Sequence, residues 1–175
     1  MAKKQIINVS ELEFQKRPAA MGKAPEGYEA ELAFVGPMLG AKLLGTSVTK
    51  VPPGNRAFPL HNHRVNEELF FILEGIGEVR IGDERFPIKK GDFLSCPPGG
   101  PATAHQIINT GDADMTYIGI STKLSPEIAE YPDSGTGKFG ILADFGADTE
   151  GKPQGFRYIG KTGDNGDYWE GEEAK

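Results

Sequence analysis

A series of short strand-like runs between residues 41 and 122 constrains this chain more than any other feature of its sequence. Each run is rich in apolar and β-branched residues, and Gly, Pro, Asn or Asp separates it from the next. Strands spaced at about eight to twelve residues are typical of a sandwich or barrel and not of a parallel α/β sheet. We therefore expect an all-β domain with strands over residues 41–51, 57–63, 68–73, 77–81, 84–88, 92–96, 104–109 and 115–121.

The segments on either side of this region have a different character. Residues 1–38 are mixed in composition, and residues 132–175 combine ten glycines with many charges. The later segment also holds aromatic residues that a solvated tail would rarely carry: Phe139, Phe145, Phe156, Tyr158, Tyr168 and Trp169. We predict irregular arms over residues 1–38 and 124–175 around a β-barrel over residues 39–123. The C-terminal arm is expected to pack on the barrel or on a partner subunit.

The best short helical signal in the chain covers residues 126–131. Pro126 suits the first position of a helix, where its missing N–H costs nothing, and Ser125 before it suits an N-cap. The pattern predicts a single short helix at this place.

Charge and cysteine content exclude several classes of protein. Lys and Arg number 19 against 25 Asp and Glu, and the net charge of −6 argues against binding to nucleic acid. The longest apolar run near the middle, residues 69–73, is too short to cross a bilayer, and the N-terminus lacks the apolar stretch of a secretory signal. A single cysteine, Cys96, excludes an internal disulfide framework and is read as a small buried residue. We predict a cytoplasmic protein.

The three histidines of the chain carry the strongest chemical signal. His61 and His63 are separated by one residue in a strand-like run, so both imidazoles point to the same face. Glu68 opens the next strand, and the turn at residues 64–66 must reset the register if its carboxylate is to join them. With His105 from a later strand, these groups suit a divalent transition metal. The alternative is that surface histidines fall together by chance or cap a strand edge.

Two segments resemble the motifs of the cupin family. Residues 54–75 are similar to the first motif, which reads Gly, five residues, His-x-His, three or four residues, Glu, six residues, Gly. The gap before His61 is six residues here, and the other gaps agree. The second motif is matched by Gly91, Pro97, Gly99, His105 and Asn109, with five residues between Gly99 and His105 where the pattern has two.

The resemblance implies a double-stranded β-helix, or jelly-roll β-barrel, with one divalent metal per chain (Mn, Fe, Ni, Co or Zn). Its expected ligands are His61, His63, Glu68 and His105. Strand alternation then places other side chains on the inner faces that carry these ligands, and we expect the pocket lining to include Phe70, Ile72, Ile107 and Asn109. For Phe70 and Ile72 an ordinary place in the core is an equal alternative.

The same resemblance implies an enzyme that acts on a small organic molecule, with the metal as Lewis acid or dioxygen-binding centre. An isomerase of sugar-phosphate type, a dioxygenase and a decarboxylase all remain open, because this fold hosts many chemistries. Arg56 and Arg64 flank the histidine pair and are candidates to contact a substrate anion. The alternative is a non-catalytic module that binds a small ligand. Proteins of this family are commonly homodimers, and we expect one here.

Overall fold

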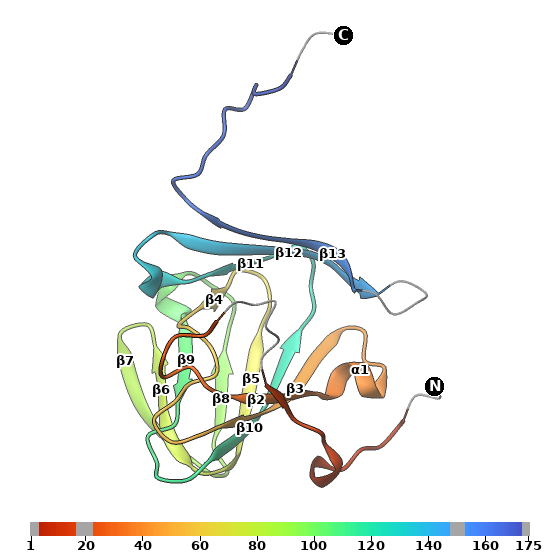
Figure 1. Cartoon of the computed structure of the whole chain (residues 1–175), viewed down its shortest axis with the longest axis vertical. Helices are drawn as coiled ribbons and strands as arrows, with labels where there is room; N and C mark the ends of the chain where they lie inside the picture. The colour runs from red at the N-terminus through yellow and green to blue at the C-terminus, as the bar shows by residue number, and fades with distance from the viewer. Residues whose placement is uncertain (1–3, 17–22, 148–152, 173–175) are drawn as a thin grey trace.

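The protein is built almost entirely from antiparallel β-strands, as the sequence predicts. The computed structural model describes residues 4–16, 23–147 and 153–172, and in these ranges thirteen strands form three sheets (Figure 1). The only α-helix there is α1 (Val35–Leu39), and 3-10 turns occur at η1 (Val9–Glu11), η3 (Pro101–Thr103) and η4 (Pro132–Ser134). No helix in the described ranges is long and apolar enough to cross a membrane. The expected all-β jelly-roll class is confirmed.

The largest sheet has six strands in the order β1-β2-β3-β10-β5-β8. Its central strand β10 pairs antiparallel with β3 on one side and β5 on the other, although β3 lies more than 60 residues earlier. Pairing between such distant segments is typical of a jelly roll or barrel. The strands are β1 (Gln15–Lys16), β2 (Glu31–Phe34), β3 (Leu44–Val51), β10 (Met115–Thr122), β5 (Glu68–Glu74) and β8 (Phe93–Cys96).

A three-stranded sheet faces the first in the order β7-β6-β9, with β6 (Ile76–Ile81), β7 (Glu84–Lys89) and β9 (His105–Ile108). The turn Gly82-Asp83 joins β6 and β7, and Ile81 lies opposite Glu84. Gly82 has φ of 55°, a left-handed conformation that glycine adopts without a Cβ clash. This tight turn fixes which side chains of β6 point inward.

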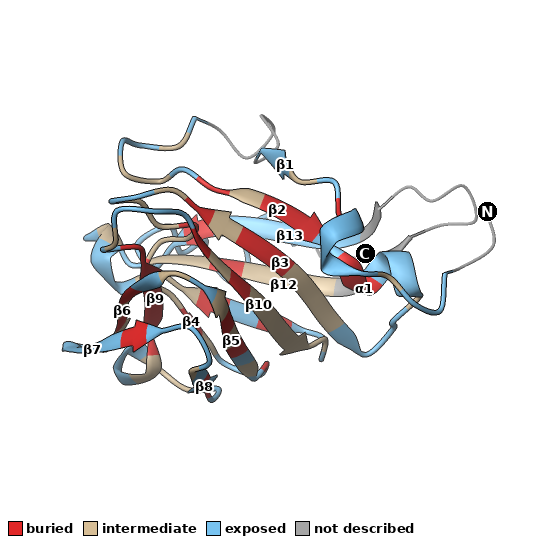
Figure 2. Cartoon of the chain, turned by 90° about the horizontal axis from the view of Figure 1, so that it is seen from below, coloured by how far each residue is buried: buried red, intermediate tan, exposed pale blue. Residues whose placement is uncertain are grey.

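The main core lies between these two sheets (Figure 2). Val51 and Ile72 from the larger sheet meet Val79 and Ile107 from the smaller one, and Ile72 is fully buried. A second apolar cluster covers the opposite face of the larger sheet, where Leu12 and its neighbours pack. Each large side chain that is fully buried is worth about 1.5–3 kcal/mol, so the barrel has an apolar support that does not depend on a metal.

The third sheet has the order β13-β12-β11-β4 and joins the C-terminal segment to the barrel. Its strands are β4 (Asn62–His63), β11 (Glu127–Glu130), β12 (Lys138–Ala147) and β13 (Pro153–Lys161). Ala129 lies opposite His63, so this sheet reaches the histidine pair directly. Beyond Lys161 the chain extends away from the body (Figure 1). The side chains of Tyr168 and Trp169 in this segment are exposed.

The prediction of a helix over residues 126–131 is wrong, because this segment is strand β11. Its residues alternate between buried and more exposed, and the strand pairs with β4 on one side and β12 on the other. Capping signals favour a helix only locally and by about 1 kcal/mol. Two ladders of backbone hydrogen bonds and the burial of Glu127 and Ala129 outweigh that preference.

Candidate metal centre

The backbone brings the predicted ligands together from four places in the chain. His61 forms an isolated bridge with His105, and each donates its backbone N–H to the other's carbonyl, at 3.3 and 2.8 Å. His63 lies in β4, and Glu68 is the first residue of β5. The pairing of His61 with the first residue of β9 holds their two imidazole rings with centroids 4.7 Å apart.

All three imidazoles approach the same carboxylate oxygen. The Oε2 atom of Glu68 lies 2.9 Å from Nε2 of His105, 3.4 Å from Nε2 of His63 and 3.9 Å from Nε2 of His61. Ligand atoms of His61, Glu68 and His105 lie within 4.8 Å of one another. His63 is outside that tighter group, but its ring still faces Glu68.

This donor set fits one divalent transition metal. Such ions bind imidazole nitrogen and carboxylate oxygen at about 2.0–2.2 Å, which allows ligand atoms up to about 4 Å from one another. Nδ1 of His61 lies 2.8 Å from the carbonyl oxygen of Pro59, which can only accept, so Nδ1 carries the proton and Nε2 keeps a free lone pair. Among the described residues, the buried Nδ1 atoms of His63 and His105 have no hydrogen-bond partner.

Electrostatics keep two of these groups in their metal-binding states at neutral pH. Burial, reinforced by the neighbouring His105, lowers the pKa of His61 to about 4, so the ring is neutral. Burial would raise the pKa of Glu68, but hydrogen bonds with His105 and His63 outweigh it and hold that pKa well below its usual range. For His63 burial is outweighed by Glu68 and Glu127, and its pKa is raised.

Glu127 is a buried carboxylate at this site that the sequence interpretation missed. Its side chain accepts hydrogen bonds from the backbone N–H groups of Arg64, Val65 and Asn66, at 3.0, 3.2 and 2.7 Å. Its Oε2 also lies 3.6 Å from Nδ1 of His63. Glu127 thus holds the turn that resets the register between the histidine pair and Glu68. No motif in the sequence singles out Glu127, because its role depends on the pairing of β11 with β4.

A cavity of about 430 Å³ opens on the cluster, and its lining includes His61, His63 and Glu68. Its wall is mostly apolar, with hydroxyl groups at intervals. Phe70 belongs to this wall, and its ring centroid lies 5.6 Å from that of His105. A largely apolar wall keeps bulk water from the cluster and strengthens electrostatic interactions inside the cavity.

Three of the residues predicted to line the pocket are not part of the cavity wall in the described structure. Ile72 and Ile107 belong to the core between the sheets. Asn109 is fully buried; its side-chain amide donates to the carbonyls of Val51 and Ala113, both at 2.8 Å. Asn109 therefore fixes the loop after β9 and stands apart from the cavity that opens on the cluster.

Neither arginine near the histidine pair is among the residues that line that cavity. Arg64 is paired with Glu130 at 2.8 Å, and its guanidinium holds the pKa of that carboxyl below its usual range. Arg56 lies over the ring of Tyr28, 5.4 Å from the centroid. The structure thus gives both side chains partners inside the protein, and their contact with a substrate anion stays a prediction.

Cys96 lies in β8 opposite Glu68 and is buried. Burial raises the pKa of its thiol to about 12, with a smaller contribution from the Glu68 charge. The thiol is therefore protonated at neutral pH, which agrees with its interpretation as a small buried residue.

Antiparallel strands folded into a barrel, with histidines and one carboxylate converging inside, define a double-stranded β-helix with a side-chain cluster that could hold a metal ion. Comparison with known families agrees, since the sequence model described as "Cupin domain" matches residues 47–121. Residues 47–121 of the chain thus form a cupin domain.

Two curated relatives match the central part of the chain. An uncharacterized protein of Methanocaldococcus jannaschii is 40% identical over 68 residues, which are 39% of this chain and 51% of that protein. An oxalate-binding protein of Thermotoga maritima is 34% identical over 71 residues, which are 41% of this chain and 55% of that protein. The chain spans about half the length of the curated relatives it matches.

Solved structures resemble the chain over a longer range. A candidate sugar phosphate isomerase of Acidithiobacillus ferrooxidans has a TM-score of 0.74 at 21% identity. The match covers 93% of this chain and 95% of that chain. A sugar phosphate isomerase of Silicibacter pomeroyi has a TM-score of 0.67 at 21% identity, and the match covers 91% of this chain and 94% of that chain. A predicted oxalate decarboxylase of Thermotoga maritima has a TM-score of 0.55 at 27% identity, and the match covers 68% of this chain and 99% of that chain. At 21% identity the first two show the fold alone.

Proposed function

We propose that this protein is a metal-dependent enzyme that acts on a small organic oxyanion. One observation carries the proposal: three imidazole nitrogens and one carboxylate oxygen converge at the wall of an otherwise largely apolar cavity. The proposed ligands are His61, His63, Glu68 and His105. Four protein ligands leave coordination positions of a six-coordinate ion for a substrate.

Each residue of the site has a role in this proposal. When bound, the metal supplies a Lewis acid that polarises a coordinated substrate oxygen, or a centre that binds dioxygen. The hydrogen bond to Pro59 orients the His61 ring, and Glu127 holds the backbone turn that places Glu68. Phe70 and its apolar neighbours exclude bulk water from the coordinated oxygen.

The reaction type remains part of the proposal. Isomerisation of a sugar-phosphate type has the support of the two structural neighbours that cover more than 90% of the chain. Decarboxylation has the support of the Thermotoga maritima structure, and oxygenation is the third option. The metal is proposed to be Mn, Fe, Ni, Co or Zn.

Elemental analysis of untagged protein, purified without added metal or chelator, is the first test. About one transition-metal ion per chain, lost in His61→Ala and His105→Ala variants that still fold, would support the proposal. Isomerisation, oxygen-uptake and carbon-dioxide-release assays would then separate the three reactions. A protein that binds no metal, even when Mn²⁺, Fe²⁺ or Zn²⁺ is added, would contradict the proposal.

A second candidate function is binding of a small ligand without turnover. The relative of Thermotoga maritima that is named an oxalate-binding protein favours it. Calorimetric titration of the metal-loaded protein with oxalate, followed by mass spectrometry of the recovered ligand, separates the two functions. Recovery of unchanged oxalate after tight binding would favour the binding module, and a consumed ligand would favour the enzyme.

We also propose a cytoplasmic homodimer with arms over residues 1–38 and 124–175 around the barrel at 39–123. The outer strand β13 has an unpaired edge in the described sheet, and Phe156 and Tyr158 on it are exposed. Such an edge gives a second copy a place to pair. Light scattering coupled to size-exclusion chromatography would test this, and a mass of one chain would contradict it.

A further inference from the structure

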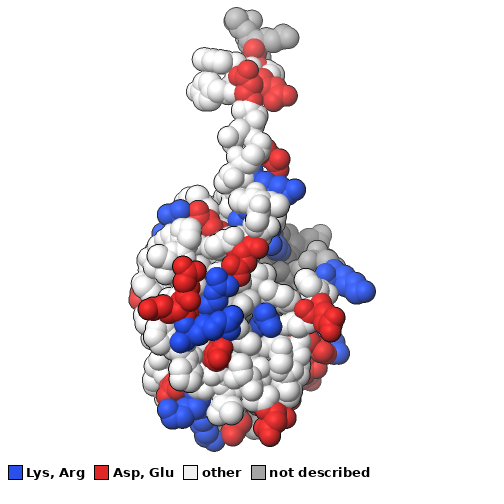
Figure 3. Space-filling model, turned by 90° about the vertical axis from the view of Figure 1, so that its left-hand side faces the viewer, with Lys and Arg blue, Asp and Glu red and all other residues white. Residues whose placement is uncertain are grey.

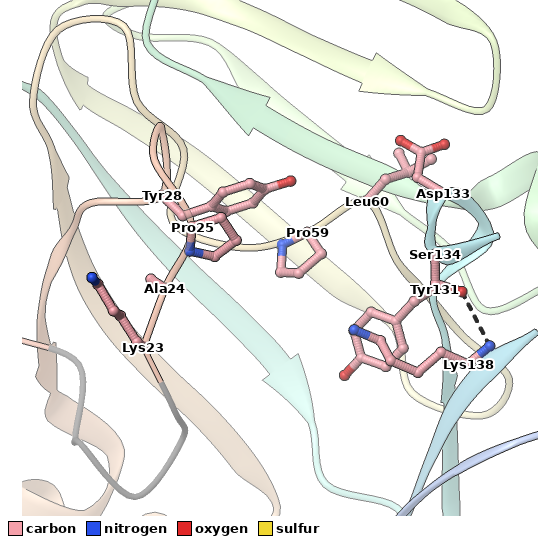
Figure 4. A pocket seen from close by; sticks show the side chains of 10 residues that line it. All are labelled: Lys23, Ala24, Pro25, Tyr28, Pro59, Leu60, Tyr131, Asp133, Ser134 and Lys138. Carbon is pink, nitrogen blue, oxygen red and sulfur yellow. Dashed lines mark hydrogen bonds between the residues drawn. The ribbon is translucent and has the colours of Figure 1, made fainter. Parts of the chain in front are cut away.

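A second cleft lies outside the barrel and shares His61 with the inner cavity. Its part nearest the histidine has a volume of about 260 Å³, with Tyr131, Lys138, Arg157 and Ile159 in its lining. A neighbouring hollow of about 350 Å³ shares Tyr131 and Lys138 with it and adds Lys23 at its far side (Figure 4). The two hollows together form what we call the outer cleft.

The register of the β12–β13 hairpin explains why two cations point into this cleft. Lys138 and Leu142 share one face of β12, and Arg157 lies opposite Leu142 on β13. Ile159 lies opposite Gly140 on that same face. Because side chains alternate along a strand, Lys138 and Arg157 both face the cleft while their sequence neighbours face away.

Aromatic rings connect these cations to the metal centre. The ring of Tyr131 is stacked on that of His61, with centroids 6.2 Å apart and an interplanar angle of 23°. Nζ of Lys138 lies 4.2 Å from the centroid of the Tyr131 ring. The Tyr131 ring therefore lies between the Lys138 ammonium and His61, a proposed metal ligand. Burial raises the pKa of the Tyr131 phenol, and the positive charge of Arg157 acts against that rise.

The cations of the outer cleft lack acidic partners. Among the described side chains, no carboxylate lies within ion-pair distance of Lys138, Arg157 or Lys23. Asp133 also lines the cleft, but Arg80 binds its two oxygens at 2.6 and 3.2 Å. On the face shown in Figure 3, most basic side chains lie beside acidic ones.

We propose that the outer cleft binds the phosphate group of a phosphate monoester, with Lys138 and Arg157 as its anchors. Two unpaired cations match a group that carries a charge of about −1.5 to −2 at neutral pH, and arginine suits its oxygens because of its fork of donors. The other end of the ligand would reach the metal centre past His61. This inference rests on the proposed function and deepens it, because it names the substrate class as phosphorylated small molecules.

Both anchors lie outside residues 47–121, the part of the chain that matches the cupin domain. The C-terminal hairpin would therefore add substrate specificity to a metal centre that the barrel provides. The cleft lies between β12–β13 and the loop that carries Pro59, so only the folded chain forms it.

Titration calorimetry on metal-loaded protein tests the proposal, with phosphoglycolate and glycolate as the two probes. Both can reach a metal through a carboxylate, but only phosphoglycolate carries a phosphate. We expect wild-type protein to bind phosphoglycolate at least about 10-fold more tightly. Lys138→Met and Arg157→Met should each remove most of that preference and leave glycolate binding unchanged. Lys89→Met, on exposed β7, makes the same change of net charge and should keep the preference.

Three results would overturn the inference. They are equal binding of the two probes by wild-type protein, an unchanged preference in both anchor variants, and tighter binding of malonate than of phosphoglycolate through the same anchors. The last would assign the cleft to a carboxylate. Metal content, measured on the same samples, keeps the two proposals distinguishable. A protein without metal contradicts the proposed function, whereas a metal-loaded protein without phosphate preference contradicts only this inference.

Discussion

The inner cluster around Glu68 and the outer cleft around Lys138 lie on two sides of one histidine, yet they are built differently. The inner cluster is held by backbone pairing of His61 with His105, by the partly buried carboxylate of Glu68 and by the buried carboxylate of Glu127. The outer cleft is held by side chains on a hairpin, where Arg157 is exposed. A metal centre needs ligands placed to a fraction of an ångström, whereas recognition of an anion tolerates longer and more mobile side chains.

Loss of a metal ligand is the change with the largest expected effect. Glu68→Gln should reduce metal affinity by about 100-fold or more, because the charged oxygen that all three imidazoles face is lost. Glu67→Gln is the matched control, since Glu67 is the exposed preceding residue and should keep full metal content. Equilibrium dialysis with Mn²⁺ or Zn²⁺ measures both. A larger loss of metal affinity in Glu67→Gln than in Glu68→Gln would mean that the register at residues 64–66 places a different glutamate in the site.

The buried carboxylate behind the cluster should have the next largest effect. Glu127→Gln leaves backbone N–H groups of the turn with a poorer acceptor, so we expect a loss of about 1–3 kcal/mol in the free energy of unfolding. Metal affinity should fall by about 10- to 100-fold, because the turn places Glu68. Urea unfolding and metal titration measure the two effects. Glu130→Gln, on the same strand, should change metal affinity little; equal losses in both variants would remove the special role of Glu127.

The two neighbouring histidines should respond to pH in opposite directions in metal-free protein. Between the ordinary pKa of 6.5 and about 4, the unfolded chain protonates His61 while the folded protein does not. Stability from this group therefore falls as pH drops through that window, by up to about 3 kcal/mol if it acts alone. The raised pKa of His63 stabilises the folded protein below pH 6.5, and that contribution is lost as pH rises through its folded value.

Urea unfolding of chelator-treated protein at several pH values between about 4.5 and 8 checks this. His61→Asn should flatten the fall in stability toward low pH, and His63→Asn should remove the loss of stability that accompanies a rise in pH above 6.5. Parallel curves for wild type and both variants would show that neither histidine changes its proton binding on folding.

The smallest effect is expected at the arginine beside the histidine pair. Arg64→Met removes an ion pair with Glu130 in which the arginine is about half exposed and screened by solvent, so the loss in the free energy of unfolding should be small. Metal content and phosphoglycolate affinity should stay unchanged, because neither the inner cavity nor the outer cleft is lined by Arg64. A large loss of phosphoglycolate affinity would move the anion site from the outer cleft to this arginine.

Much of the inner site could be predicted because its signals are local. The spacing of His61 and His63 on one strand requires a common face, and a strand start at Glu68 follows from the pattern of apolar residues. The second motif supplied His105 in spite of its longer preceding loop, part of which forms η3. Prediction failed at residues 126–131, where a local capping signal favoured a helix and pairing with β4 and β12 made a strand.

By itself the sequence determined the all-β class and the four side chains that face one another at the inner cluster, since alternation and turn residues act over a few positions. Only the tertiary structure decided what surrounds them. Glu127 reaches the turn at Arg64 from 63 residues away in the sequence. The register of the β12–β13 hairpin places Lys138 and Arg157 in the lining of the same cleft as His61. Such contacts depend on how strands pair across the chain, and strand pairing is set by the packing of the whole barrel.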